Sequence, residues 1–197
     1  MRKLLVLVML IVSAAAARTQ EMVDYYAGKD SVVARTLVYS IKTDELGIYH
    51  IANKDNQIDT KIAVHYPSER QMHRTETPPI ETDKNLALEI VRSILLKNSK
   101  LDLNSLDNTG FIIRFTVDPY KERILELYFV LGTKGSNPFG VISPEELEEI
   151  EVGLKEKIIC KPRQPLHMDQ NHADYFSHLY GHYKISFHGG EMIIRGT

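Results

Sequence analysis

The sequence predicts an α+β protein in which two helices pack on an antiparallel β-sheet, with a small β meander preceding them. Three observations support this fold class. Apolar and polar residues alternate over 111–117 and over 183–188, which is the pattern of half-buried strands. A helix with its own capping residues starts at Ser143. The Gly189-Gly190 pair between two strand-like runs predicts a tight hairpin turn.

The N-terminal part of the mature chain, residues 18–66, is expected to form the β meander. Short runs of β-branched and aromatic residues occur there, separated by Gly, Asn and Asp. Residues 67–82 contain three prolines among charged and polar residues, which indicates a linker or a long surface loop. Residues 83–197 then form the predicted α+β domain.

The first helix of that domain is expected over residues 84–97. Asp83 suits the N-cap position, because its carboxylate can accept hydrogen bonds from the first free backbone N–H groups. Apolar residues follow at helical spacing and predict one buried side, namely Leu86, Ala87, Ile90, Val91, Ile94 and Leu95.

The second helix is expected over residues 144–158. Ser143 is the N-cap, Pro144 occupies the first helical position, and Glu146 follows the serine by three residues, which makes a capping box. We expect the run of glutamates over 145–151 to lie in solvated first turns. The buried stripe is predicted to be Leu147, Ile150, Leu154 and Ile158.

Four further runs complete the predicted sheet. Residues 111–117 read as a half-buried strand, and the almost continuously apolar residues 124–131 read as a central strand. The chain ends in a predicted hairpin of strands 183–188 and 192–195 around the two glycines.

The first seventeen residues have the pattern of a secretory signal peptide. A basic start at Arg2 and Lys3 precedes an apolar run over 4–12 and four alanines over 14–17. The apolar run is too short for a membrane span, which needs roughly 20 residues. We therefore expect a mature protein that begins near Arg18, is periplasmic or secreted, and has no membrane span once the signal is removed.

The charge balance argues against nucleic acid as a partner. The chain has 24 basic and 26 acidic residues, and loss of Arg2 and Lys3 with the signal would leave 22 basic residues against the same 26. Nucleic-acid binding depends on an excess of Lys and Arg that neutralises phosphates. This composition is instead ordinary for a globular protein.

The second half of the chain resembles the C-terminal domain of the TonB/TolA family of periplasmic proteins. The resemblance covers residues 84–188 and rests on the α-β-β-α-β order and on four segments, FIIRFTVDPYKERILELYFVL, SPEELEEIEVGLKEKI, CKPRQ and YGHYKISF. The whole chain also resembles a family of uncharacterised secreted proteins of anaerobic gut bacteria, a domain of unknown function.

The resemblance implies a fold and a binding style. TonB-type proteins keep an uncleaved membrane helix and a long proline-rich spacer because they transmit force across the periplasm. This chain has a cleavable signal pattern and a linker with three prolines, so force transduction is not implied. What the resemblance implies is an exposed sheet edge that accepts a peptide strand, for example the final strand 191–195.

The one cysteine, Cys160, is expected to be a packed structural residue. It follows the end of the second predicted helix, where the negative end of the helix dipole disfavours a thiolate. A reactive thiol is the alternative, since Lys157 and Lys161 would favour the thiolate.

Histidines gather near the C-terminus and suggest an alternative function. Imidazole is a good ligand for zinc, nickel and copper. The spacing matches no closed zinc pattern, and no His-Glu-x-x-His segment is present, so a polar loop is the competing interpretation of residues 167–188. Under the metal hypothesis the ligands would come from His172, His178 and His182, with His167 and His188 nearby.

No catalytic or cofactor-binding residue can be assigned from motifs. The sequence lacks a G-x-S-x-G segment and a phosphate-binding Gly-Lys-Ser or Gly-Lys-Thr loop. We therefore expect a non-enzymatic, exported binding or interaction module of the cell envelope, with a protein or peptide partner and no cofactor. The alternative is a metal-binding protein or metal-dependent enzyme that uses the histidine-rich residues 167–188.

Overall fold

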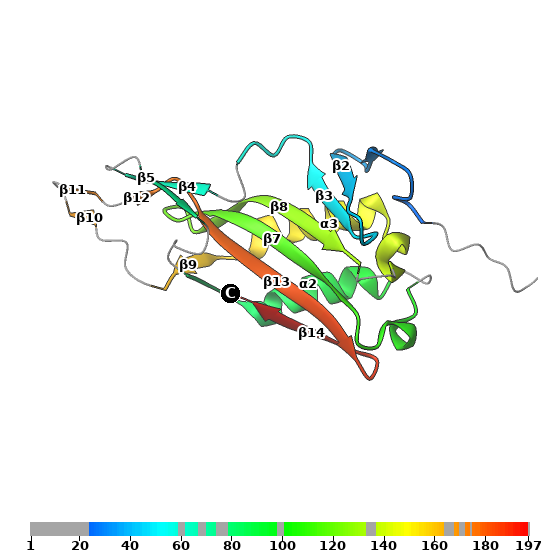
Figure 1. Ribbon diagram of the computed structural model, residues 1–197. Helices are drawn as coiled ribbons and strands as arrows, with labels where there is room; N and C mark the ends of the chain where they lie inside the picture. Colours follow the sequence, from blue (N-terminus) through cyan, green and yellow to red (C-terminus); the bar gives the residue numbers. More distant parts are fainter. Residues whose placement is uncertain are drawn as a thin grey trace, which may run out of the picture.

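The computed structural model describes residues 24–58, 62–66, 70–73, 79–97, 101–132, 137–163, 168–169, 172–173 and 175–196. These residues form a large antiparallel sheet with two helices across one face (Figure 1). The predicted signal peptide over 1–17 and His167 lie outside the described residues. The α+β class, with an antiparallel sheet and two helices, is confirmed.

The sheet has seven strands in the order β1-β2-β3-β8-β7-β13-β14, and all neighbours are antiparallel. The strands are β1 (Ser31–Val33), β2 (Val38–Thr43), β3 (Tyr49–Asn53), β7 (Gly110–Asp118), β8 (Arg123–Leu131), β13 (Leu179–His188) and β14 (Glu191–Gly196).

The two helices are α2 (Lys84–Leu95) and α3 (Pro144–Lys157), and both predicted N-caps are confirmed. The Asp83 side chain accepts a hydrogen bond from the Leu86 N–H at 3.0 Å. Ser143 and Glu146 make both hydrogen bonds of the capping box. These local bonds satisfy N–H groups that a helix leaves free at its start, so each helix begins where the sequence predicts.

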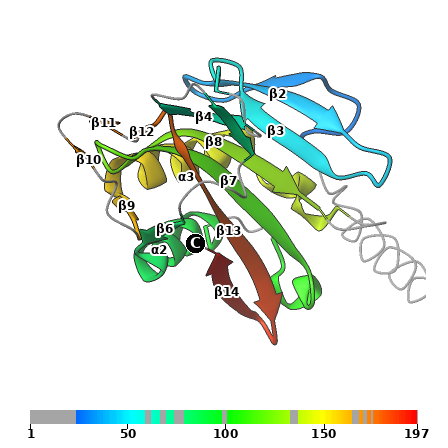
Figure 2. The same ribbon diagram turned by 60° about the vertical axis from the view of Figure 1, so that its left-hand side comes forward.

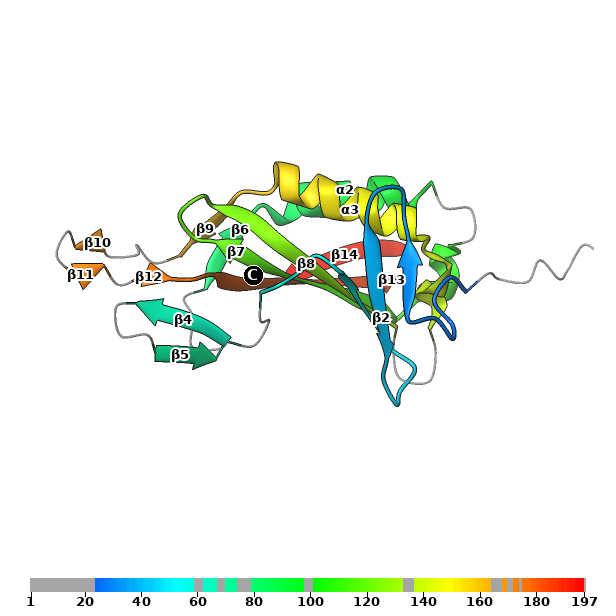
Figure 3. The ribbon, with the colours of Figure 1, turned by 90° about the horizontal axis from the view of Figure 1, so that it is seen from above.

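The core lies between the helices and the face of the sheet that they cover (Figure 3). Along the strands, alternate side chains are buried on the side of the helices, as strand geometry requires, and Thr116 of β7 and Ser186 of β13 are buried as well. The stripe Leu147, Ile150 and Leu154 of α3 is fully buried, and α2 contributes Ala87, Val91 and Leu95. Burial of these apolar faces holds the two layers together.

The predicted C-terminal hairpin is present and longer than expected. β13 begins at Leu179 rather than at residue 183, and it pairs with β14 over six residues. Gly189 and Gly190 both have positive φ, 57° and 79°, as a primed two-residue turn requires.

The N-terminal strands are arranged differently from the separate meander expected over 18–66. β1, β2 and β3 continue the main sheet, because β3 pairs with β8. The last strand of the expected meander, β4 (Ile62–Tyr66), instead forms a small sheet with β5 (Arg70–His73) and β12 (Tyr175–Phe176). Sheet pairing thus crosses the boundary that composition suggested between residues 66 and 83.

The remaining elements are short. β6 (Ile80–Thr82) pairs with β9 (Cys160–Pro162), and β10 (Met168–Asp169) pairs with β11 (His172–Ala173). Two 3-10 turns, η1 (Leu103–Leu106) and η2 (Pro138–Val141), join larger elements. β5 and β6 lie in the stretch over 67–82 that was expected to be a linker or loop.

Figure 2 shows β14 at the margin of the sheet, beside β13 and near α2. Figure 3 shows the helices on one side of the sheet and β4 and β5 toward the other. Within the described part of the chain, no helix combines the length and the apolar character that crossing a membrane requires.

Candidate binding face

The face of the sheet that the helices leave uncovered, here called the open face, carries two rows of cross-strand neighbours. Residues paired in register on one face of a sheet lie about 5 Å apart, so a row of pairs makes a continuous strip. The first row crosses six strands, and its members are Lys42, His50, Val130, Ile112, Lys184 and Arg195. The second row crosses five strands through Ser40, Ala52, Tyr128, Arg114 and His182.

Basic residues lie at both ends of the first row. Lys42 is exposed near one edge of the sheet, and Lys184 and Arg195 are exposed near the other. Six strands at a spacing of about 4.8 Å separate the outermost residues by about 24 Å. The second row adds the half-buried Arg114 and the exposed His182. The open face therefore has its cationic groups spread over a strip instead of gathered at a point.

The helical layer carries an excess of acidic residues. α3 has Glu145, Glu146, Glu148, Glu149, Glu151 and Glu156 against Lys155 and Lys157. The separation of charge between the two faces is partial, because Glu126 and Glu191 lie on the open face, in register with Thr116 and His188. Sequence reasoning missed this separation because the basic residues of the open face lie between positions 42 and 195, and only the strand register brings them together.

A hollow of about 580 Å³ opens beside the second row. It lies between the open-face side chains of β2, β3 and β8 and the loop over 54–58. Its lining is mainly polar and consists of Ser40, Ala52, Asn53, Lys54, Asn56, Gln57, Ile58 and Tyr128.

Hydrogen bonds to β8 hold the loop that walls this hollow. The Asn56 side-chain amide donates to the Leu127 carbonyl at 2.9 Å. Glu126 accepts hydrogen bonds from the Gln57 and Ile58 N–H groups, at 2.6 and 3.1 Å, and from the Tyr128 hydroxyl at 2.6 Å. Because these bonds join the loop to the strand, they hold the wall of the hollow in place.

The histidines of the alternative hypothesis lie at different places. His178 is buried, and its ring is hydrogen-bonded to the Ser177 and Tyr180 hydroxyls at 2.9 and 2.7 Å. His182 is exposed on β13. Four residues of extended chain separate the two by about 13 Å, too far for both to bind one ion directly.

His172 begins β11, and its side chain is not among those described. Among the residues that the structure describes, no group of three or more His, Cys, Asp or Glu side chains is placed to hold a metal ion. A metal site in the histidine-rich segment stays a prediction from the sequence.

The expectation that the glutamates of α3 are all solvated is wrong. Glu148 and Glu151 are buried, because they lie on the side of α3 that faces β2 and the β1–β2 turn. Glu148 accepts hydrogen bonds from the Thr36 hydroxyl and from the Thr36 N–H, the latter at 3.1 Å. Burial alone would raise the pKa of Glu148, but these bonds outweigh it and hold the pKa below its usual value.

Cys160 is confirmed as a packed residue. It lies in β9, and burial, with a smaller contribution from Glu122, raises the pKa of its thiol to about 12. A thiol with that pKa is almost entirely protonated at neutral pH and is therefore a poor nucleophile.

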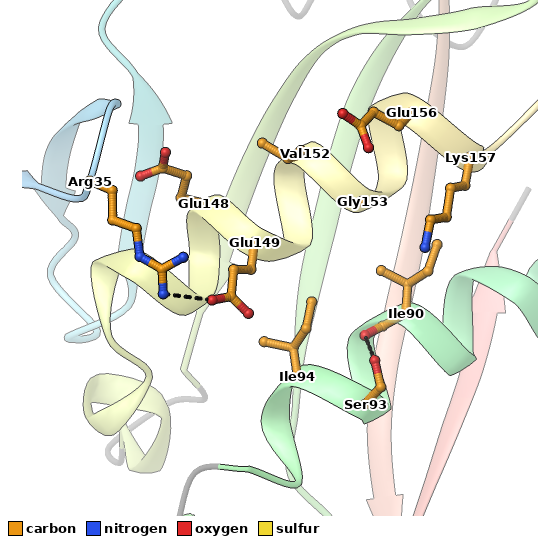
Figure 4. Close-up of a pocket in the computed structure, with 10 residues that line it drawn as sticks. All are labelled: Arg35, Ile90, Ser93, Ile94, Glu148, Glu149, Val152, Gly153, Glu156 and Lys157. Carbon is orange, nitrogen blue, oxygen red and sulfur yellow. Dashed lines mark hydrogen bonds and ion pairs between the residues drawn. The ribbon is translucent and has the colours of Figure 1, made fainter.

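A second depression, of about 370 Å³, lies between the helices on the far side of the molecule from the open face (Figure 4). Ile90 and Ile94 of α2 face Val152 and Gly153 of α3 there. A Cβ atom at Gly153 would come within 2.9 Å of Ile90, so the glycine permits this close helix crossing. The depression therefore follows from helix packing.

Comparisons with known proteins give a shared fold. No protein-family model matches the sequence. No curated protein matches it. The crystal structure of a DUF5043 family protein from Bacteroides uniformis is similar, with a TM-score of 0.63, 18% identity, and coverage of 84% of this chain and 89% of that chain. At that identity the similarity shows that the two chains share their architecture over most of their length.

Proposed function

We propose that this protein is an exported, non-enzymatic binding module of the cell envelope, and that its open face is the binding surface. The observation that carries the proposal is the pair of cross-strand rows, which gather Lys42, Arg114, Lys184 and Arg195 on one face of a chain with net negative charge. Basic side chains that share one face attract anionic partners and speed their association.

The shape of the charge distribution favours binding over catalysis. A catalytic site brings an acid, a base or a nucleophile within about 3 Å of one reacting atom. On the open face the cationic groups instead extend along a strip of about 24 Å. Such a strip suits an extended anionic ligand or surface.

The test is retention of the mature protein, residues 18–197, on a sulfonate cation-exchange resin at pH 7.5 and low ionic strength. We expect retention despite the net negative charge, and we expect the Lys184→Glu/Arg195→Glu variant to pass through. The control, Lys97→Glu/Lys157→Glu, changes the net charge equally but reverses two exposed lysines near the helix ends, and it should still be retained.

Failure of the wild-type protein to bind the resin would contradict the proposal, as would equal loss of retention in both variants. Circular dichroism of each variant shows whether the fold is kept. The chromatography therefore reports on the open face and not on unfolding.

A second binding mode is supported by the position of β14. β14 ends the sheet, so no described strand pairs with its outer side. An extended peptide could add there through main-chain hydrogen bonds, as the TonB/TolA resemblance implies. Peptides that bind the protein can be selected from a random library. If they add as a strand, methylation of alternate backbone nitrogens should abolish their binding, because it removes the N–H groups that pair with β14. Binding that survives this methylation would exclude strand addition.

Export is proposed from the signal-peptide pattern over 1–17. Expression of the full chain in a Gram-negative host should place the protein in the periplasm or the medium. Its mass, measured by mass spectrometry, should be that of a chain that starts near Arg18. A full-length protein that stays in the cytoplasm would contradict this part of the proposal.

A further inference from the structure

We infer that the open face takes a linear acidic polysaccharide, laid across the strands, with sugar hydroxyls in the hollow beside Tyr128 and carboxylates at the basic ends of the first row. This inference rests on the proposed binding function and names its ligand class.

The basic residues at the two ends of the first row lie too far apart for one small anion. The exposed cations Lys42, Lys184 and Arg195 lie at opposite ends of a row that is about 24 Å long. One small anion cannot contact both ends. A polymer with a carboxylate on each residue can contact both at once, and each added contact raises the affinity through a high local concentration.

The hollow is lined by polar groups and one aromatic ring. Gln57 supplies an amide that can donate and accept, Ser40 supplies a hydroxyl, and Lys54 supplies an ammonium group. The Tyr128 ring adds an apolar wall to the hollow. The Tyr128 hydroxyl makes hydrogen bonds to the Glu126 carboxylate and to the Ile58 carbonyl, which fix the ring in place. Paired donors and acceptors beside an aromatic ring suit a sugar, which presents hydroxyl groups around an apolar ring face.

The apolar content of the open face favours a polysaccharide over a folded protein as the ligand. The core of a protein interface is apolar and rich in aromatic residues. The large apolar residues that the described part of the chain exposes all lie outside both rows, namely Val33, Leu46, Leu96, Tyr120, Val152 and Ile159. The centre of the first row consists of Val130 and Ile112, which are only half-buried, so the open face offers a small apolar area to a folded protein partner.

Hydrogen bonds hold the hollow and the two rows in fixed positions. The loop over 54–58 is bound to β8 by the Asn56 and Glu126 hydrogen bonds, and the rows lie on paired strands. A preformed site loses little conformational entropy when a flexible polymer binds. The hollow and the rows can thus act as one continuous surface.

The test is calorimetric titration of the mature protein with three probes. They are an oligogalacturonate of about ten sugars, a neutral malto-oligosaccharide of the same length, and poly-L-glutamate of the same charge. We expect binding of the oligogalacturonate, none of the neutral sugar, and at least about tenfold weaker binding of poly-L-glutamate. The affinity should fall with salt, since cation contacts release counterions.

Two variants connect binding to the two parts of the surface. Lys184→Glu/Arg195→Glu should weaken oligogalacturonate binding at least about tenfold, whereas Lys97→Glu/Lys157→Glu should not. Gln57→Ala should weaken the oligogalacturonate but leave poly-L-glutamate binding unchanged, because Gln57 carries no charge and would contact hydroxyl groups only.

The outcomes separate this inference from the proposed function. If poly-L-glutamate bound as tightly as the oligogalacturonate, and the Lys184→Glu/Arg195→Glu variant lost this binding, the inferred polysaccharide ligand would be overturned. The open face would then be a general anion-binding surface. No binding of any anion, together with no retention on the cation exchanger, would overturn both. Retention on the resin with no oligogalacturonate binding would overturn the polysaccharide alone.

Discussion

The Tyr39 hydroxyl donates a hydrogen bond of 2.9 Å to Oε2 of Glu151, and this bond connects the sheet to helix α3 inside the protein. Lys155 binds the other carboxylate oxygen, Oε1, at 2.6 Å. Glu151 is only 1% exposed, so its negative charge depends on these two partners. Burial and the nearby Glu151 charge both raise the pKa of Tyr39, which keeps the phenol protonated as a donor.

Tyr39→Phe should therefore destabilise the fold by about 1–3 kcal/mol, because a buried carboxylate oxygen loses its donor. Urea unfolding followed by circular dichroism measures the change. Tyr120→Phe is the control, since Tyr120 is 40% exposed and its substitution should cost far less. Equal stability of the two variants would refute a structural role for the Tyr39–Glu151 bond.

The contribution of Glu148 to the stability of the fold should depend on pH. A carboxyl group whose pKa is lowered by folding contributes stability above its unfolded pKa of about 4.3, and that stability is lost as pH falls through the folded pKa. Glu148→Gln should lower the free energy of unfolding at pH 7, and the deficit should shrink as the pH falls below about 4. Unfolding curves at both pH values measure this.

Glu149→Gln is the matched control for Glu148. Glu149 lies next to Glu148 on α3 and forms an exposed ion pair with Arg35 at 2.8 Å. Exposed ion pairs contribute about 0–1 kcal/mol. A pH-dependent deficit as large for Glu149→Gln as for Glu148→Gln would contradict the role assigned to the Thr36 hydrogen bonds.

Leu154→Asp should unfold the protein or cost several kcal/mol, because Leu154 is fully buried and a carboxylate there would lack a partner. Val152→Asp places the same residue two positions earlier on the same helix, where Val152 is 41% exposed. We expect Val152→Asp to keep a cooperative thermal transition close to that of the wild type. Comparable losses in the two variants would show that α3 does not pack through the Leu154 side.

The Cys160 thiol should resist alkylation in the folded protein. With a pKa of about 12, almost none of it is thiolate at pH 8, and its burial blocks access of a reagent. Iodoacetamide labelling followed by mass spectrometry should be at least about a hundredfold slower in buffer than in denaturant. Similar rates in both conditions would show an accessible, reactive thiol.

Local signals in the sequence predicted the central elements well. The Asp83 cap and the Ser143–Glu146 capping box specify helix starts through hydrogen bonds within four residues, so no other part of the chain is needed to recognise them. The alternation over 111–117 and the Gly189-Gly190 turn are equally local. The two helices and the strands β7, β8 and β13 lie close to their predicted positions, with the short strands β9, β10, β11 and β12 between α3 and β13.

Long-range pairing could not be predicted in the same way. Nothing near Tyr49–Asn53 indicates that this strand pairs with Arg123–Leu131, more than seventy residues later, and continues the main sheet. The burial of Glu148 and Glu151 was missed for a related reason. A glutamate in a helix is solvated by default, and only the approach of Thr36 from the β1–β2 turn and of Tyr39 from β2 provides the donors that make burial possible.

The fold class, the helix starts, the C-terminal hairpin and the packed character of Cys160 could be predicted from the chain alone, because they depend on periodicity, capping and neighbouring residues. The membership of the seven-stranded sheet, the buried carboxylates of α3 and the rows of basic residues on the open face became visible only in the folded protein. Each of these depends on strand register between distant segments, which is set by the sum of many weak contacts and not by any one motif.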